Sequence, residues 1–414
     1  MLGIIRRDRL PRPPALAALA ALALAGACAA SDTGGSGLGR SACTSPGVSA
    51  TEIRLGLLLS DTGPAAEIWQ GMRSGIEARL GEVNEGGGVH GRKIVYSWRD
   101  DESNGALNIS GARDLVGGAG VLALLEGSSV VGESAQYLDD QGVPVAGVAQ
   151  EAAWSQHPNM ISYANIAPPD TRTRDTLARY ARAVGGDSAV VVIAGLFEAS
   201  VQGGARITES LAAGGVPVVA TLDYTQGASS PARLAQQIAA TGADVLVSAL
   251  PGGAFAEIYA AARQAGIPLR AAVSAAGLDQ GLVDAYGTQI SGAAYYTSVV
   301  PLEVSSPVHQ PYLDAMARYA PGQSPDTKNA LDAYITTDLL VQGLEAAGAC
   351  PTREGLLTAL RSFDAYDGGG LLSAPVDLTA GFGRPPACYT FVVVNQAGRG
   401  FEVAPQSPIC PGAP

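Results

Sequence analysis

The sequence predicts an α/β protein of two lobes, each with a largely parallel sheet covered by helices on both faces. Three observations support this fold class. Residues 53–98 have the pattern of a strand–helix–strand unit, and such units close right-handed onto a parallel sheet. The same alternation then continues in two series, separated by a break rich in Pro, Asn and Ser at residues 158–169. The connections are only a few residues long, as they are in α/β units.

The opening unit is the clearest part of this pattern. Residues 53–59 form a nearly continuous apolar run, which is typical of a strand buried on both faces of a sheet. A turn cluster at 60–64 ends the strand, and apolar residues at helical spacing lead to a second strand at 93–98. Because ligands bind beyond the carboxyl ends of parallel strands, we expect residues 60–69 to form the first wall of a ligand site.

The remaining elements follow in order. The first series is predicted to add helices and strands at 106–116, 121–125, 131–141 and 143–148. The second series is predicted at 171–184, 188–193, 201–213, 216–222, 232–241, 244–250, 254–265, 269–274 and 293–299. Helices at 308–319, 327–347 and 352–361 and strands at 389–394 and 401–403 close the chain. Two α/β series followed by returning helices predict a cleft between two lobes.

Length and charge exclude some classes of protein. A chain of 414 residues is long enough for two domains. Its net charge of −12 argues against a nucleic-acid partner, because phosphates bind basic surfaces. We expect the acidity to reflect a solvated, secreted surface.

The N-terminus has the pattern of an export signal. Arg6, Arg7 and Arg9 precede a short apolar stretch at 15–24, as in a signal peptide. The small residues before Cys28 resemble the lipobox of bacterial lipoproteins, in which the cysteine is acylated and becomes the first residue of the mature chain. The alternative is an ordinary secretory signal that is cleaved nearby.

The cysteines predict disulfides rather than a metal site. Assigning Cys28 to the lipid anchor leaves an even number in an exported chain, which predicts two disulfides among Cys43, Cys350, Cys388 and Cys410. Three pairings are possible, and we favour Cys43 with Cys410 and Cys350 with Cys388, which would attach the C-terminal tail. No pair has zinc-ribbon or redox-motif spacing, so we expect no metal and no cofactor.

The sequence contains no catalytic pattern. The glycines of 86–91 match the spacing of a dinucleotide loop, but they follow a helix and precede a strand, the reverse of the required order. His90, His157 and His309 lack metal-ligand spacing, and we expect them on the surface. The acidic cluster 100–102 is expected to be an exposed strand end, because no second cluster would complete a metal shell.

Two features at the strand ends are candidates for ligand contact. Ser128 and Ser129 lie between a strand and a helix start, where hydroxyls and N–H groups bind anionic or carbonyl groups. The same serines would also serve as helix caps. Trp69 follows the loop of the first strand, where it would be either a stacking wall or a core anchor.

Several short segments form a recognisable set when taken in order. They are Glu-Ile-Arg-Leu-Gly at 52–56 with Thr-Gly-Pro at 62–64, Val-Asn-Glu-Gly-Gly-Gly-Val-His-Gly-Arg at 83–92, Asp-Asp at 100–101, Gly-Ser-Ser at 127–129, Gln-Gly-Val-Pro at 141–144 and Ala-Ala-Arg-Gln-Ala-Gly at 261–266. In them the chain resembles the branched-chain amino-acid (Leu/Ile/Val-binding-like) type of ABC transporter substrate-binding lipoprotein, of the type I periplasmic binding protein family. The similarity runs from about Glu52 to Phe401.

The resemblance implies two doubly wound α/β lobes that are joined by a three-crossing hinge, with the ligand cleft between them. The implied organisation is a signal peptide at 1–27, a lipid-anchored tether at 28–48, a first lobe at 50–167 plus 300–387, a second lobe at 168–299 plus 388–405, and a C-terminal tail at 406–414. Hinge closure would clamp the ligand.

The resemblance also implies which residues bind the ligand. In amino-acid-binding relatives the serine turn and the end of the fourth strand hold the ligand carboxylate, and these positions are Ser128, Ala149 and Glu151. In the second lobe, the acidic position that receives the α-ammonium group is Ala275, and the aromatic positions are Ser200 and Pro251. Together with Trp69 and Ser129, these residues are the predicted ligand contacts.

Two of these positions depart from the family pattern. Glu151 replaces a small hydroxyl residue and would repel a carboxylate unless it is protonated. Ala275 offers no charge to an α-ammonium group, and an unpaired buried ammonium is costly. We therefore predict that the protein does not bind ordinary α-amino acids. An amide, a polyol-like or aromatic compound, or a cationic ligand paired with Glu151 fits better.

These features favour a monomeric, lipid-anchored protein on the outer face of the bacterial cell membrane. It would capture a small polar or aromatic molecule, deliver it to an ABC permease and have no enzymatic activity. One alternative is a ligand-sensing subunit of the same fold, which only its partner would distinguish. Another is a secreted α/β hydrolase, which would need a nucleophile, a base and an orienting residue within mutual reach.

Overall fold

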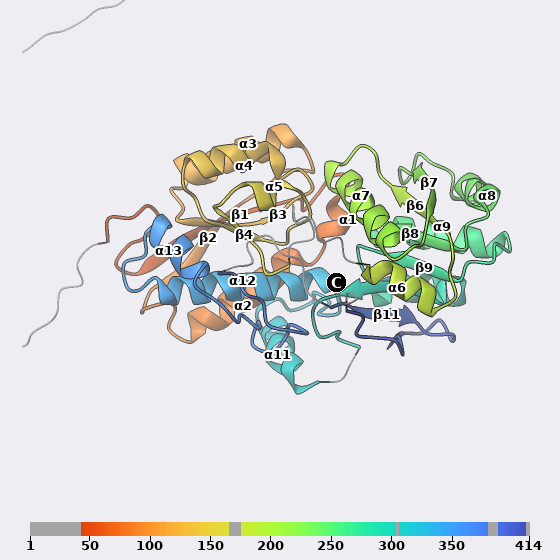
Figure 1. Ribbon diagram of the computed structural model, residues 1–414. Helices are drawn as coiled ribbons and strands as arrows, with labels where there is room; N and C mark the ends of the chain where they lie inside the picture. The colour runs from red at the N-terminus through yellow and green to blue at the C-terminus, as the bar shows by residue number, and fades with distance from the viewer. Residues whose placement is uncertain (1–42, 165–174, 304–305, 380–387, 411–414) are drawn as a thin grey trace, which may run out of the picture. The chain divides into compact units, whose positions relative to one another are not determined.

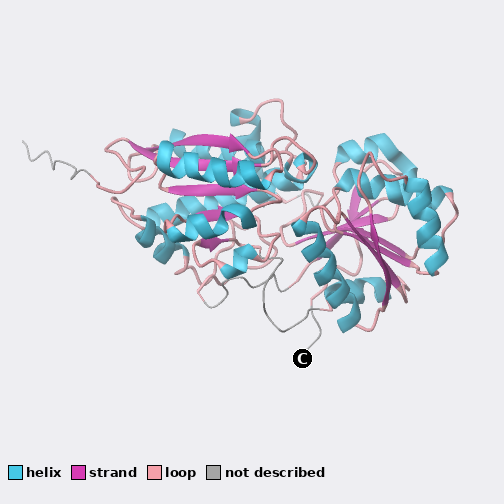
Figure 2. Cartoon of the chain, turned by 90° about the horizontal axis from the view of Figure 1, so that it is seen from above, coloured by secondary structure: helices cyan, strands magenta, loops and turns pink. Residues whose placement is uncertain are grey.

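The described part of the chain folds on two β-sheets (Figure 1). The computed structural model describes residues 43–164, 175–303, 306–379 and 388–410. One sheet has the strand order β2-β1-β3-β4-β5, and the other has the order β12-β11-β10-β9-β8-β6-β7. Figure 2 shows the strands of each sheet enclosed by helices. Each sheet with the helices packed on it is called a lobe here.

The first lobe is built on parallel strands. They are β1 (Glu52–Leu59), β2 (Lys93–Asp100), β3 (Ala123–Gly127), β4 (Val145–Gly147) and β5 (Met160–Ile161). β1 lies between β2 and β3, so that Leu57 pairs with Trp98 on one side and Leu125 on the other. Its leucines are fully buried, which confirms the opening strand and its two covered faces.

Helices cover both faces of this sheet. They are α1 (Ala66–Trp69), α2 (Met72–Glu85), α3 (Gly105–Arg113), which continues as a π-helical turn (Asp114–Gly118), α4 (Gly132–Asp140), α5 (Ala153–Gln156), α11 (Gln310–Tyr319), α12 (Lys328–Ala346) and α13 (Arg353–Leu360). The returning helices α11 and α12 lie against α2, far away in sequence. They share one apolar core with β1, while α3 and α4 cover the opposite face.

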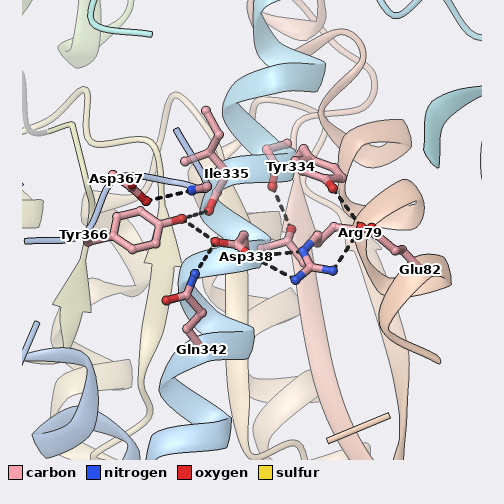
Figure 3. Close-up of polar contacts among 11 residues, drawn as sticks. Arg79, Glu82, Tyr334, Ile335, Asp338, Gln342, Tyr366 and Asp367 are labelled. Carbon is pink, nitrogen blue, oxygen red and sulfur yellow. Dashed lines mark hydrogen bonds and ion pairs between the residues drawn. The ribbon is translucent and has the colours of Figure 1, made fainter. Parts of the chain in front are cut away.

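A close helix–helix contact fixes α12 in the first lobe. At Gly75 of α2, a Cβ atom would lie 2.0 Å from the carbonyl oxygen of Ala330 on α12, so only glycine permits this approach. Figure 3 shows a buried polar network beside it, in which Arg79 of α2 points toward Asp338 of α12. Their ion pair is 2.9 Å long, and the Tyr366 hydroxyl donates to the same carboxylate at 3.0 Å.

The second lobe has a mixed sheet. Its strands are β6 (Ala189–Ile193), β7 (Val218–Asp223), β8 (Val245–Ser248), β9 (Ala271–Ser274), β10 (Ala293–Thr297), β11 (Thr390–Val394) and β12 (Phe401–Val403). The last two strands pair antiparallel and the others parallel. The helices are α6 (Thr176–Ala183), α7 (Glu198–Ala213), α8 (Pro231–Thr241), α9 (Gly252–Gln264) and α10 (Gln280–Tyr286). Apolar cores on both faces of the sheet confirm the doubly wound α/β prediction.

One of the three predicted lobe crossings falls within the described residues. After β10 it returns to the first lobe, where Val299 belongs to the first-lobe core and pairs with Leu372. The other two predicted crossings fall at 165–174 and 380–387, outside the described residues. The predicted signal peptide and Cys28 also lie outside them.

The disulfide pairing differs from the one favoured above. Cys43 is bonded to Cys350 and Cys388 to Cys410, so all four cysteines pair, but the favoured combination is wrong. Cys43 begins the first lobe and Cys350 follows α12 of the same lobe, so this bridge closes one lobe. Cys388 and Cys410 flank the last two strands of the second lobe, and their bridge attaches the C-terminal end locally.

Some local structure was not anticipated. The short elements β5, α5 and α10 are not among the predicted elements, because two to seven residues carry little periodicity. Val48 is buried and pairs with Ile53, so the end of the predicted tether is attached to the first lobe. Ile409 pairs with Tyr389 in the same way at the predicted tail. No helix within the described ranges is long and apolar enough to cross a membrane.

Candidate functional site

A cavity lies between the two lobes, beyond the carboxyl ends of strands of both sheets. Its volume is about 190 Å³. The first lobe contributes Pro64, Ala65, Ile68, Ser129 and Gln150. The second lobe contributes most of the lining, from α6, from one face of α7, and from the residues that follow β6, β8 and β9, together with Tyr296 and Tyr389. Most of these residues are apolar or aromatic, as in small-molecule sites.

The loop after β1 is held by two adjacent aspartates. Asp100 accepts hydrogen bonds from the Thr62 hydroxyl at 2.6 Å and from the Asp61 and Thr62 amides. Although partial burial acts in the opposite direction, these bonds lower the pKa of Asp100 below its usual value. Asp101 is fully buried and accepts from the Ser60 and Ser128 hydroxyls at 2.6 and 2.5 Å. The expectation of an exposed acidic strand end is therefore wrong for Asp101, because it organises the loops that follow β1 and β3.

The two serines after β3 have different positions. Ser128 is buried, donates to Asp101 and accepts from the Val130 amide at 3.1 Å, and it does not line the cavity. Ser129 lines the cavity and accepts a hydrogen bond from the Trp69 indole at 2.9 Å. Trp69 itself is buried in the first-lobe core and lies outside the cavity lining.

Glu151 occupies the N-terminus of α4. Its carboxylate oxygens accept hydrogen bonds from the Val131 and Gly132 amides, each at 3.1 Å. The side chain is 3% exposed and does not line the cavity. Burial raises the pKa of Glu151 to about 7, despite these two bonds. The donors that would be free to bind a ligand carboxylate at this helix end are thus already taken by the chain's own carboxylate.

Of the other predicted ligand contacts, some line the cavity and one does not. Ser200, Pro251 and Ala275 of the second lobe line the cavity. The Ser200 hydroxyl accepts from the Ala194 amide at 2.8 Å and donates to the Ala249 carbonyl at 2.5 Å, so it joins β6 to β8. Ala149 is fully buried and lies outside the lining.

The most polar group in the cavity is one that the sequence did not single out. Arg206, on α7, lines the cavity, and its Nη2 donates to the Gln150 carbonyl across the cleft at 2.9 Å. Its Nε is buried and has no acceptor among the described residues. Burial lowers the pKa of Arg206, offset in part by Tyr296 and Glu209, but an arginine stays charged at neutral pH. Among the described residues Arg206 forms no ion pair, although the Glu209 carboxylate, which also lines the cavity, is near enough to act on its pKa.

A sequence signal for Arg206 exists but is weak. It lies on the cleft side of α7 with Phe197, Ser200 and Gly203, at spacings of three residues. One charge among small and apolar residues on that face was a possible clue. An arginine on a helix is nonetheless usually a solvated surface residue, so spacing alone could not select it.

Three hydrogen bonds hold the lobes together around the cavity. Arg206 provides one, and the Ala152 amide donates to Gln202 at 2.6 Å. The third runs from the Gly253 amide, at the start of α9, to the Glu67 carboxylate of α1 at 2.5 Å. Because side chains of α7 and α1 reach the opposite lobe, rotation of one lobe away from the other would break these bonds.

Within the described residues, neither metal-ligating side chains nor the three histidines form a second candidate site. No group of three or more metal-ligating side chains occurs in the ranges that the structure covers. His90 is exposed, and His157 is partly buried beside Asp139. His309 is only 3% exposed and bonds the Val300 carbonyl at 3.0 Å, so the expectation of a surface residue is wrong for His309.

This fold and its inter-lobe cavity define a solute-binding protein, and sequence comparison agrees. Residues 52–399 match the periplasmic binding protein family, and the chain belongs to that family. The predicted type I periplasmic-binding-protein fold is confirmed, and with it the extracytoplasmic class of protein.

Individual relatives are distant. The Leu/Ile/Val-binding protein BraC3 of Rhizobium johnstonii is 25% identical over 315 residues, which are 75% of this chain and 83% of that protein. A substrate-binding protein of an ABC transporter from Aeropyrum pernix has 18% identity and a TM-score of 0.78, over 88% of this chain and 97% of its own. A solute-binding protein from R. palustris, in complex with benzoate, has 18% identity and a TM-score of 0.70, over 86% and 96%.

Proposed function

We propose that this protein captures a small carboxylate with an apolar or aromatic body and delivers it to the permease of an ABC importer. The observation that supports the ligand class is Arg206, a partly buried residue whose Nε is buried and has an unused donor, in a largely apolar cavity. A carboxylate is the natural partner, because guanidinium groups bind it through charge-assisted hydrogen bonds. Such a bond contributes about 1.5–3 kcal/mol.

The same geometry argues against two other ligand classes. A cationic ligand would face Arg206, and Glu151 is turned away from the cavity toward the amides of α4. An α-amino acid would bring an ammonium group, for which Ala275 offers no charge. The lining beside Arg206 instead includes Ile207, Tyr296 and Tyr389, which suit a ring or a short aliphatic chain.

The relatives support this proposal without deciding it. The R. palustris protein is in complex with benzoate, a carboxylate on an apolar ring. BraC3 is named for leucine, isoleucine and valine, which carry carboxylates as well as ammonium groups. A carboxylate on an apolar body is the chemistry common to both names, and it is the chemistry that Arg206 and the lining would bind.

We propose further that the protein acts as a monomer, without turnover, at the outer face of the membrane. Support for the anchor comes from the sequence, in which Cys28 follows an apolar stretch and small residues. The Ser- and Gly-rich sequence that follows Cys28 would serve as the tether between the anchor and the lobes. Replacing Cys28 with serine should release the protein from the membrane fraction if the proposal is right.

The ligand class is tested by comparing matched ligands with matched variants. Isothermal titration calorimetry of the signal-less protein would compare benzoate with benzamide, which keeps the ring but loses the charge, and with leucine. We expect benzoate to bind and benzamide and leucine to bind much more weakly. Arg206→Gln should weaken benzoate binding by about 10- to 100-fold, while Arg233→Gln, on an exposed part of α8, should leave it unchanged.

Two results would overturn the proposal. One is tight binding of leucine, and the other is equal binding of benzoate to the wild type and to Arg206→Gln. Mass spectrometry of the incubated ligand would separately show whether it is recovered unchanged, and a product would refute the absence of turnover.

A further inference from the structure

The cavity is elongated along one helix. Its lining follows a single face of α7, at Phe197, Ser200, Gly203, Arg206, Ile207 and Ser210. At a rise of about 1.5 Å per residue, this face spans about 20 Å. Arg206 lies well inside this length, so the cavity continues past the guanidinium toward α6.

A buried hydroxyl lies in that continuation. Thr176, the first residue of α6, lines the cavity and is only 2% exposed. Its Oγ1 has no hydrogen-bond partner among the described residues. Buried polar groups are otherwise nearly always paired, so an unpaired hydroxyl at a cavity wall points to a partner supplied from the cavity.

The position of Thr176 relative to Arg206 follows from the helix contact. The amide of Leu177, the next residue, donates to the Ser210 hydroxyl at 3.3 Å, which fixes the start of α6 against α7. Ser210 lies four residues after Arg206, so their Cβ atoms are about 6 Å apart on the helix surface. Thr176 therefore lies about one helical turn along α7 beyond the position of Arg206.

The wall between these two polar groups is apolar and aromatic. Ile207 lies on the same face of α7, and the rings of Tyr296 and Tyr389 meet edge to face, with centroids 5.2 Å apart. The hydroxyl at the opposite end of the helix face, that of Ser200, already donates one hydrogen bond and accepts another within the protein. The Thr176 hydroxyl, by contrast, has no hydrogen-bond partner among the described residues.

We propose that Thr176 is a specificity-determining residue that hydrogen-bonds a second polar group of the ligand. The ligand class is then a carboxylate whose apolar body carries a hydroxyl or carbonyl group at the end away from Arg206. This inference rests on the proposed function and refines it. A site that contains a hydrogen-bonding group for a ligand hydroxyl discriminates against analogues that lack it, because its buried polar atom is left unpaired.

Matched pairs of carboxylates test this inference. Calorimetry of the full-length mature protein would compare 4-hydroxybenzoate with benzoate, and 5-hydroxypentanoate with pentanoate. We expect the wild type to prefer the hydroxylated member of at least one pair by roughly two- to tenfold, the effect of one neutral hydrogen bond. Thr176→Val, which has the same shape but no hydroxyl, should lose this preference and retain its affinity for the unsubstituted carboxylate.

Two further variants control for structural effects. Thr208→Val removes a hydroxyl that donates to the Gly204 carbonyl within α7 and lies outside the cavity lining, and it should keep the preference. Thr176→Ser retains a hydroxyl and should keep it as well, which separates a lost hydrogen bond from a disturbed start of α6.

The outcomes distinguish the two proposals. If the carboxylates bind through Arg206 but the wild type shows no preference, or Thr176→Val retains it, the role of Thr176 is refuted and the proposed function stands. If no carboxylate binds, or Arg206→Gln binds all of them as the wild type does, both proposals are refuted.

Discussion

Replacing the buried Glu126 with glutamine should change the pH dependence of stability. Glu126 lies on β3 and is fully buried. Burial raises the pKa of Glu126 to about 8, and the nearby carboxylates of Asp101 and Glu151 add to this effect, while a hydrogen bond from Asn108 acts against it. The carboxyl group is therefore neutral in the folded protein at pH 7 but ionised in the unfolded chain.

The sign and size of the effect follow from proton linkage. Between pH 4.5, the ordinary glutamate value, and pH 8, the folded state holds a proton that the unfolded state has released. The free energy of unfolding therefore falls as pH rises through this range, by about 1.4 kcal/mol per pH unit. Over the whole range the loss is about 4–5 kcal/mol. Glutamine has nearly the same shape and no charge, so it should abolish this contribution.

The assay is urea unfolding between pH 5 and 8.5, followed by tryptophan fluorescence. The free energy of unfolding of Glu126→Gln minus that of the wild type should grow with pH and level off near pH 8. Glu151, whose pKa is also raised by burial, to about 7, remains in both proteins, so only the part of its contribution that arises from coupling with Glu126 enters this difference. Glu345→Gln, at an exposed position, is the control. A difference that does not vary with pH would refute the assignment of a neutral, buried Glu126.

Two further predictions concern the lobes themselves. Asp338→Ala should lower the free energy of unfolding by about 1–3 kcal/mol, because it removes the shared acceptor of Arg79 and Tyr366, while Glu82 still pairs with Arg79 at 3.0 Å; urea unfolding would measure this, and benzoate affinity should not change. Gly253→Ala should weaken the closed arrangement of the lobes, because its Cβ would lie 2.5 Å from the Glu67 carboxylate, and the flexible Glu67 side chain would move and give up an inter-lobe hydrogen bond. Small-angle scattering should show a larger radius of gyration, with Gly117→Ala, where nothing lies within 4 Å of the added atom, as the control. An unchanged radius would argue against this contact as a closing bond.

The sequence was sufficient for the fold class and for most of the longer helices and strands. The helix expected at 327–347 is α12 (Lys328–Ala346), and the strand expected at 401–403 is β12 (Phe401–Val403). Hydrophobic periodicity reports which side of an element is buried, and this is a local property. Two alternating α/β series then leave few possible topologies, because crossover connections are right-handed.

The disulfide pairing and the polar contacts between segments far apart in sequence could not be predicted from hydrophobic periodicity. Four cysteines allow three pairings, and spacing does not distinguish them. Only the folded chain brings Cys43 beside Cys350, 307 residues away. The burial of Asp101 is of the same kind, since a carboxylate in a loop looks exposed until its hydroxyl partners arrive from two other loops.

The sequence by itself thus determined that this chain forms two wound lobes with a cleft at the strand ends. Tertiary structure decided the chemistry of that cleft. It turned Glu151 away toward the amides of α4 and placed Arg206, with an unused donor, among apolar side chains. The physical reason is that the strength of a charge depends on whether it is desolvated and on what lies within a few ångströms, and neither is fixed until elements distant in sequence have packed.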